Sequence, residues 1–291
     1  MIHSNRGILL PLLCLFAAMI SIQGGATLAK QLFPIVGAEA VTAYRLGFSA
    51  IILLIIFKPW KRKLQVGYRR YLIFYGLALG SMNFLFYQSI KTIPLGIAVG
   101  LEFTGPLAVA LYSSRRKIDF VWIALVVLGL LALIPFNDTS NMDLLGVFYA
   151  LAAGVCWALY IIFGQKAGNY YGTATVAIGS AVAAVVYVPI GVATGGIGIF
   201  APEYLPIALT VAILTSALPY ALEMMALTRM PAKTFGTLTS LEPAIAAVFG
   251  FLILSEVLSF VQIAGIIAII LASLGASLSS TKSIETVKTI D

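Results

Sequence analysis

Long hydrophobic runs, separated by short stretches with polar or charged residues, dominate the sequence. A helix needs roughly 20 apolar residues to cross the hydrocarbon core of a membrane. Runs of about that length predict ten transmembrane helices, over residues 8–28, 37–57, 71–90, 95–113, 119–136, 143–164, 173–194, 204–226, 233–254 and 260–280. Continuous apolar stretches such as 51–57 and 263–271 lack the alternation of β-barrel strands. The pattern therefore predicts an all-α integral membrane protein.

Composition agrees with a membrane protein, and the distribution of charge predicts on which side of the membrane the loops and termini lie. Of the 291 residues, 61% are hydrophobic and 10% are charged, whereas soluble domains carry roughly 25% charged residues. The net charge of +7 is therefore read as a topology signal rather than as a nucleic-acid footprint, because cytoplasmic loops are rich in Lys and Arg. Placing both termini in the cytoplasm leaves only Lys30 and Lys91 outside and Arg45 within a helix. The run 8–28 is too long for the core of a cleaved signal peptide.

Two passages of the chain echo each other at a shift of 137 residues. They run from Pro94 to Pro106 and from Pro231 to Pro243, and each carries a glutamate and a second proline near the middle of a predicted helix. Five helices in each half is an odd number, so equivalent helices must cross the membrane in opposite directions, as in many secondary transporters. We expect two inverted five-helix repeats, 1–137 and 143–280, followed by a cytoplasmic tail, 281–291.

Three glutamates within predicted helices mark the first place to look for function. A carboxylate at bilayer depth is costly, so Glu102, Glu223 and Glu242 should face the bundle interior or a wet cavity. Burial disfavours the charged form of a carboxyl group, which makes these three acids proton-coupling candidates. For Glu223, a simple contact with Arg229 is the favoured alternative. Prolines inside helices free backbone carbonyls, and helix kinks are predicted at Pro106, Pro219 and Pro243.

Arg45 and a few polar or aromatic side chains are the substrate-binding candidates. Arg45 and Glu102 have similar predicted depths, so they would pair with each other, or the guanidinium would grip a carboxylate substrate in a bidentate manner. The further candidates are Gln23, Asn83, Tyr87, Trp157 and Tyr160. For Gln23 the alternative is a hydrogen bond between helices, and for the two aromatic residues 157 and 160, which share a helix face, it is ordinary packing.

Other classes of function find no support. Cys14 and Cys156 lie in predicted helices and His3 is the only histidine, so neither a metal site nor a Cys/His catalytic pair is expected. A phosphate-binding P-loop is absent, and we expect no cofactor. Small residues Ala264, Ala268 and Ala272 in the last predicted helix would pack either within a monomer or in a weak homodimer.

Several local sequences resemble a known family of transporters. They are Ser21-Ile-Gln-Gly-Gly-Ala, Pro94-Leu-Gly-Ile-Ala-Val, Leu101-Glu-Phe-Thr-Gly-Pro-Leu-Ala-Val-Ala110, Ser113-Ser-Arg-Arg116, Thr175-Val-Ala-Ile-Gly-Ser180 and Thr234-Phe-Gly-Thr237. With the ten predicted helices, they resemble the ten-helix, two-EamA-domain branch of the drug/metabolite transporter superfamily, and within it the bacterial threonine/homoserine exporters. The likeness runs from about residue 12 to 280.

This resemblance implies export of small amino acids, L-threonine and L-homoserine, across the bacterial inner membrane by proton antiport with alternating access. An EamA-type exporter of other small metabolites or amino-acid analogues remains the alternative. The expected partners are a small amino acid, protons and the lipid bilayer, with no nucleic acid.

Overall fold

The computed structural model describes residues 4–61, 68–112, 117–133, 143–195, 201–227, 238–239 and 241–288. Within these ranges the regular elements are helices and no strand occurs, which confirms the predicted all-α class. The α-helices are α1 (Ser4–Val36), α2 (Ala38–Phe57), α3 (Arg69–Ile90), α4 (Leu95–Glu102), α5 (Thr104–Tyr112), α6 (Lys117–Leu133), α7 (Leu144–Tyr171), α8 (Ala174–Gly195), α9 (Leu205–Ala212), α10 (Leu218–Leu227), α12 (Glu242–Leu254) and α13 (Phe260–Lys288). A 3₁₀-helix covers Pro59–Lys61, and a π-helix, Ile213–Ala217, joins α9 to α10.

Many of these helices are suited to a bilayer. Among the described residues, five segments are long and apolar enough to cross one: Leu10–Val36, Ala38–Lys61, Leu144–Gly168, Ala174–Gly195 and Leu205–Glu223. Four shorter apolar helices accompany them: Leu95–Val109, Phe120–Ala132, Glu242–Leu254 and Phe260–Ala272. Their outward faces carry large exposed hydrophobic side chains such as Phe120, Leu252 and Phe260. Since water would penalise such surfaces, their natural surroundings are lipid.

The predicted runs differ from the observed helices in two ways. Helix α1 continues past residue 28 to Val36 because Ala29, Leu32 and Phe33 are buried in the core, and α7 likewise continues past residue 164 to Tyr171. The predicted helix 95–113 is broken at Phe103, between α4 and α5, and the helix 204–226 contains the π-helix. Each break lies just before a proline of the predicted kinks, whose missing N–H weakens the helical ladder.

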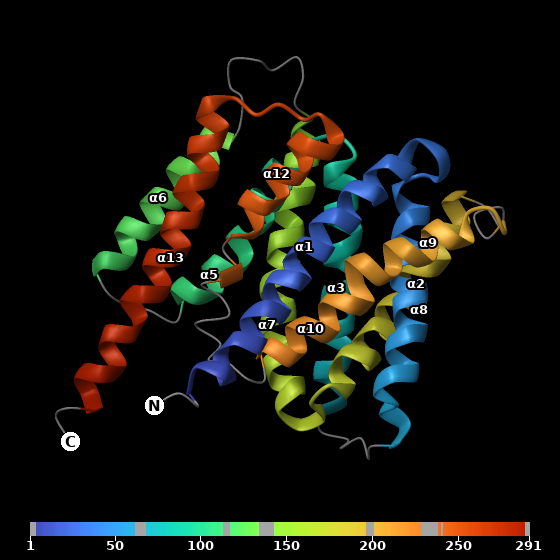
Figure 1. Ribbon diagram of the computed structural model, residues 1–291, viewed down its shortest axis with the longest axis horizontal. Coiled ribbons are helices and arrows are strands. Elements are labelled where there is room, and N and C mark those ends of the chain that lie inside the picture. Colours follow the sequence, from blue (N-terminus) through green and yellow to red (C-terminus); the bar gives the residue numbers. More distant parts are fainter. Residues whose placement is uncertain are drawn as a thin grey trace.

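Several contacts between helices occur twice, once in each sense: a contact between two helices recurs between their counterparts when the first half of the chain is exchanged with the second (Figure 1). Helix α3 packs against α7 and α8, and correspondingly α10 packs against α1 and α9 against α2. Three further pairs join equivalent helices of the two halves: α2 with α8, α4 with α12, and α6 with α13. The members of the α6–α13 pair run in opposite directions along the molecule. Helix α1 begins and α13 ends at one end, opposite the α12–α13 connection.

Close approaches of small residues bring helices of the two halves together. A Cβ added to Gly105 would lie 1.8 Å from the carbonyl oxygen of Gly154, so α5 and α7 meet backbone to backbone. A Cβ on Gly96 would lie 2.9 Å from the Cα of Ala247, where α4 crosses α12. On α13, Ala268 faces Gly129 of α6, which places part of the small-residue row predicted for this helix within the chain. Small residues serve this purpose in membrane bundles.

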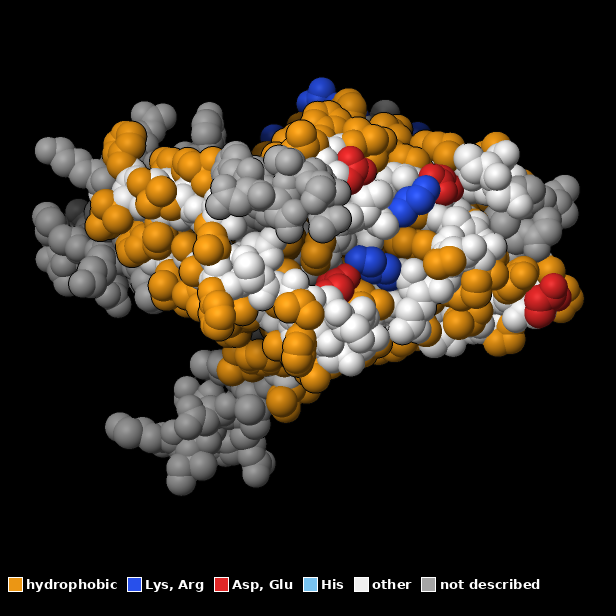
Figure 2. Space-filling view, turned by 90° about the horizontal axis from the view of Figure 1, so that it is seen from above, with side chains coloured by type: hydrophobic (Ala, Val, Ile, Leu, Met, Phe, Trp, Pro, Cys, Tyr) orange, Lys and Arg blue, Asp and Glu red, His pale blue; other side chains and the backbone are white. Residues whose placement is uncertain are grey.

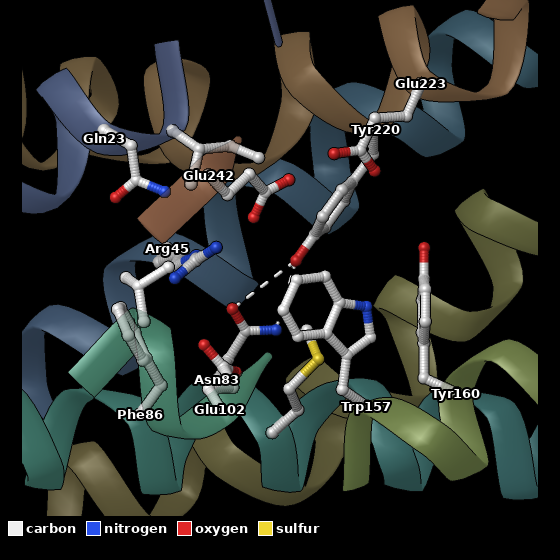
Figure 3. A pocket seen from close by; sticks show the side chains of 13 residues that line it. Gln23, Arg45, Asn83, Phe86, Glu102, Trp157, Tyr160, Tyr220, Glu223 and Glu242 are labelled. Carbon is white, nitrogen blue, oxygen red and sulfur yellow. Dashed lines mark hydrogen bonds between the residues drawn. The ribbon is translucent and has the colours of Figure 1, made fainter. Parts of the chain in front are cut away.

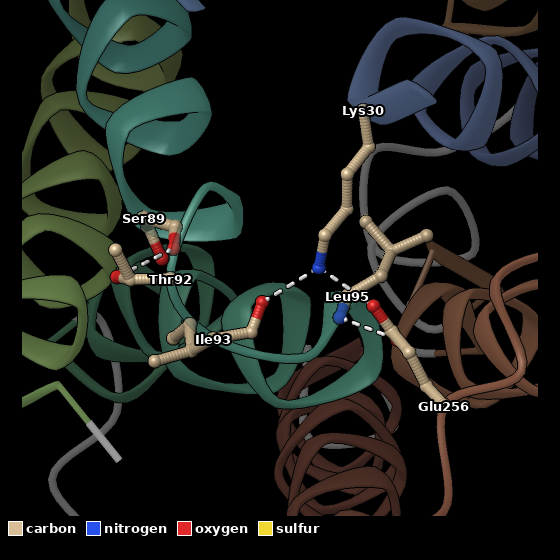
Figure 4. Close-up of polar contacts among 6 residues, drawn as sticks. All are labelled: Lys30, Ser89, Thr92, Ile93, Leu95 and Glu256. Carbon is tan, nitrogen blue, oxygen red and sulfur yellow. Dashed lines mark hydrogen bonds and ion pairs between the residues drawn. The ribbon is translucent and has the colours of Figure 1, made fainter. Parts of the chain in front are cut away.

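At the end of the bundle that includes the α12–α13 connection, one cluster of contacts ties the two halves together (Figure 4). The ammonium Nζ of Lys30, on α1, lies 2.6 Å from Oε1 of Glu256 and donates to the carbonyl of Ile93 at 3.0 Å. The second oxygen of Glu256 accepts from the backbone N–H of Leu95 at 2.8 Å, at the start of α4. We call these four residues the Lys30–Glu256 clasp. The view onto this end shows acidic and basic side chains in contact near the middle of the face (Figure 2).

Candidate functional site

A polar cavity lies in the middle of the bundle (Figure 3), with a volume of about 60 Å³. It is bordered by α1, α2, α3, α4, α7, α10 and α12, so both halves of the chain contribute to it. The lining residues are Ile22, Gln23, Arg45, Met82, Asn83, Phe86, Val99, Glu102, Trp157, Tyr160, Tyr220, Glu223 and Glu242. Eight of the residues proposed from sequence meet here, although they are spread over more than 200 positions.

Arg45 is held by the π-helix between α9 and α10 rather than by an acid. Its Nε donates to the hydroxyl of Ser216 and its Nη2 donates to the carbonyl of Thr215, each at 2.7 Å. The guanidinium carbon lies 5.1 Å from the ring centre of Tyr87, which gives it an aromatic support. Of the two alternatives for Arg45, an ion pair with Glu102 is not formed among the described residues, although both line the cavity.

The carbonyl that receives Arg45 is available because of the local sequence. In an α-helix, the oxygen of Thr215 would accept from the N–H of residue 219, but that residue is a proline and has no N–H. The π-helix over Ile213–Ala217 shifts the pairing further, as shown by the bond from Leu218 N–H to the carbonyl of Ile213. A membrane helix must satisfy such a freed carbonyl internally, and a guanidinium from α2 does so.

The three candidate acids surround the cavity from three different helices. Glu102 is the last residue of α4 and Glu242 the first of α12, and their side chains are 7% and 5% exposed. Glu223, on α10, also lines the cavity; Arg229, its predicted alternative partner, lies outside the described residues. Pro243 falls in the first turn of α12, where the lack of an N–H is harmless.

Residues related by the repeat shift face each other across the cavity. The amide Nδ2 of Asn83 donates to the hydroxyl of Tyr220 at 3.1 Å, and these residues are 137 positions apart. The same shift separates two further pairs that line the cavity, Gln23 with Tyr160 and Phe86 with Glu223. A pocket with this composition lies where the two halves of the chain meet.

The remaining candidates divide into cavity residues and supporting residues. The side-chain oxygen of Gln23 is buried and accepts no hydrogen bond from the described residues, so an acceptor is left over at the cavity wall. Trp157 packs edge-on against Phe103 at 5.8 Å between ring centres, and Tyr160 stacks on Tyr75 at 4.8 Å. Tyr87 does not line the cavity and instead lies against the Arg45 guanidinium.

The sequence reading overlooked Tyr220, Thr215 and Ser216. Counting four residues back from Pro219 would have found Thr215 as the owner of a free carbonyl, and adding 137 to Asn83 would have found Tyr220. Ser216 had no comparable signal because small polar residues are common in membrane helices.

Comparisons with known proteins place the chain among transporters. A family model described as "EamA-like transporter family" matches residues 144–278. The chain is 56% identical over 274 residues to the threonine/homoserine exporter RhtA of Escherichia coli strain K12, covering 94% of this chain and 93% of that protein. The exporter of the same name from Salmonella typhimurium strain SL1344 is 56% identical over 271 residues, covering 93% and 92%. A crystal structure 14% identical in sequence superposes with a TM-score of 0.67 over 96% of this chain and 98% of the other, which supports the fold alone.

Proposed function

Because the chain belongs to the EamA-like transporter family, we propose that it exports small amino acids, L-threonine and L-homoserine, across the inner membrane of a bacterium. It is a multi-pass membrane transporter rather than an enzyme. The substrates named for its relatives, at 56% identity over nearly the whole chain, support this choice of cargo. The observation that carries the proposal is the cavity itself, where one guanidinium and three carboxyl groups share a wall without pairing with each other.

Such a cavity suits a zwitterion. A free amino acid needs a cation for its carboxylate and an anion for its ammonium group, because each charge loses its hydration inside the bundle. Arg45 offers the first, through guanidinium N–H groups beyond the two that bond Ser216 and Thr215. Glu102 or Glu242 offers the second, being buried and free of ion pairs among the described residues.

The hydroxyl of threonine or homoserine requires a neutral partner. The Asn83–Tyr220 pair and the free oxygen of Gln23 supply both a donor and an acceptor in the same cavity. A site built around such groups rejects analogues that lack the hydroxyl, since its own polar atoms would then stay unpaired. Trp157 and Tyr160 complete the wall beside them.

Proton antiport follows from competition for one carboxyl group. A protonated Glu102 or Glu242 cannot pair with the substrate ammonium group, whereas a deprotonated one can, so proton and substrate occupy the site in turn. Glu223 is the third group able to exchange the proton. Alternating access would be provided by two inverted repeats, residues 1–137 and 143–280, which meet at the cavity. The exchange-symmetric helix contacts and the family match over 144–278 support these boundaries.

The alternative cargo is another small metabolite or an amino-acid analogue. A direct test is counterflow of labelled L-threonine in proteoliposomes of the purified protein, with homoserine, cysteine and nucleobases as competitors. Saturable counterflow, inhibited by homoserine in preference to the others, is expected. Absence of threonine counterflow in vesicles that transport another competitor would overturn the proposed cargo.

A further inference from the structure

Arg45 is the one described cation in the cavity, yet its guanidinium would be of little use to a carboxylate if it rotated freely. Bidentate binding needs two N–H groups in one plane and in a fixed direction. Neighbouring groups must therefore fix the plane of the Arg45 guanidinium. This side chain is 5% exposed and is flanked by neutral groups.

Two hydrogen bonds and one ring define that plane. Nε is taken by the hydroxyl of Ser216 and one N–H of Nη2 by the carbonyl of Thr215, both at 2.7 Å. Tyr87 supports the guanidinium at 5.1 Å. The carbonyl of Thr215 keeps its direction because it belongs to the backbone of the π-helix, and the hydroxyl of Thr215 is bound in turn to the carbonyl of Val211 at 2.7 Å. Among the described residues, these contacts leave the Nη1 group and the second N–H of Nη2 for another partner.

We infer that Ser216 is a positioning residue, which together with the Thr215 carbonyl orients the Arg45 guanidinium so that the site distinguishes a carboxylate from an uncharged group. This inference rests on the proposed function, in which Arg45 binds the substrate carboxylate. Ser216 does not line the cavity itself. It belongs to the π-helix, an irregularity that often occurs at functional sites and here turns a hydroxyl and a neighbouring carbonyl towards one side chain of α2.

The test compares two inhibitors of labelled-threonine counterflow: L-threonine and L-threoninamide, which lacks the carboxylate. The readout is the ratio of the concentrations that halve transport, which a general loss of packing would leave unchanged. In the wild type the amide should require the higher concentration. Ser216→Ala should lower this ratio about tenfold, the effect of one hydrogen bond to a charged group.

Ser216→Thr keeps the hydroxyl group and should therefore show the wild-type ratio, unlike Ser216→Ala. Ser216→Cys, close in volume and with a weak acceptor, serves if the alanine variant does not fold, and should give a lowered ratio. Ser180→Ala is the matched control, since Ser180 is equally buried but has no hydrogen-bond partner among the described residues and lies outside the cavity. It should match the wild type.

Two other results would be decisive. If Arg45→Lys lowers the ratio but neither Ser216→Ala nor Ser216→Cys does, the positioning role of Ser216 is wrong while the proposed role of Arg45 stands. If the wild type does not distinguish acid from amide, Arg45 does not bind the carboxylate, and both inferences are overturned.

Discussion

The Lys30–Glu256 clasp and the central cavity both take charged groups out of water, but they treat them differently. In the clasp, the ammonium meets a carboxylate and a carbonyl, and the second carboxylate oxygen meets a backbone N–H. In the cavity, one guanidinium is bonded to neutral groups, while Glu102 and Glu242 have no cationic partner among the described residues. The clasp matches its charges within the structure, whereas the cavity leaves charged groups that, in the proposed function, bind a ligand.

This difference has an energetic reason. Burial of an unpaired charge is costly, and it is retained in a membrane protein mainly where function needs it. A clasp that is 20% exposed at Lys30 and 12% at Glu256 has already matched its charges, so it gains nothing from a substrate. In the proposed transport cycle, the cavity would gain its missing partners only when cargo or protons enter.

The largest effect is expected from neutralising the cavity acids. The two variants are Glu102→Gln and Glu242→Gln. Whichever of them removes the proton-exchanging carboxyl group should transport threonine without dependence on an imposed pH gradient, because an amide does not titrate in this range. The measurement is threonine efflux from vesicles with and without the gradient. Wild-type coupling in both single variants would remove these two acids from the proposed antiport.

The next effect concerns Arg45. Arg45→Lys keeps the charge but loses the fork and cannot bond Ser216 and Thr215 in the same way. We expect the apparent affinity for threonine to fall roughly hundredfold, since two hydrogen bonds to a charged group are worth about 3 kcal/mol together. The measurement is the threonine concentration for half-maximal counterflow. An unchanged value would separate Arg45 from substrate binding.

A smaller effect on stability is expected at the clasp. Glu256→Gln should lower the free energy of unfolding by about 2 kcal/mol, between the values for exposed and fully buried ion pairs. Thermal unfolding in detergent measures this change, with Glu203→Gln as control, because Glu203 is exposed and has no ion-pair partner among the described residues. Equal stability of the two variants would mean that the clasp is not a structural contact of this kind.

The smallest effect is expected from Ser180→Ala. The buried hydroxyl of Ser180 has no hydrogen-bond partner in the described parts of the chain, so its removal leaves no other group unpaired. The free energy of unfolding should change by less than about 0.5 kcal/mol. A loss comparable to that of Glu256→Gln would show that Ser180 makes a polar contact of its own.

More of the fold than of the candidate site could be predicted from the sequence. The hydrophobic runs located the helices because lipid imposes length and apolarity on every crossing segment, and the prolines located the breaks before Pro106 and Pro219. The acids, Arg45 and Asn83 were singled out because polar groups stand out against an apolar background, and all of them line the cavity. Their partners were not: Arg45 bonds to Thr215 and Ser216, which are 170 and 171 residues away, and no local pattern carries that information.

The clasp has one further consequence. Lys30 and the N–H of Leu95 bond to the two oxygens of the same Glu256 carboxylate, so displacement of that one side chain removes a partner from both. The contacts made by Glu256 are therefore lost together when its side chain leaves this end of the bundle. A movement that parts the two halves at this end would have to leave the ammonium of Lys30 and the N–H of Leu95 without the carboxylate they share, so the first turn of α4 and the C-terminal part of α1 both depend on one residue of the second half.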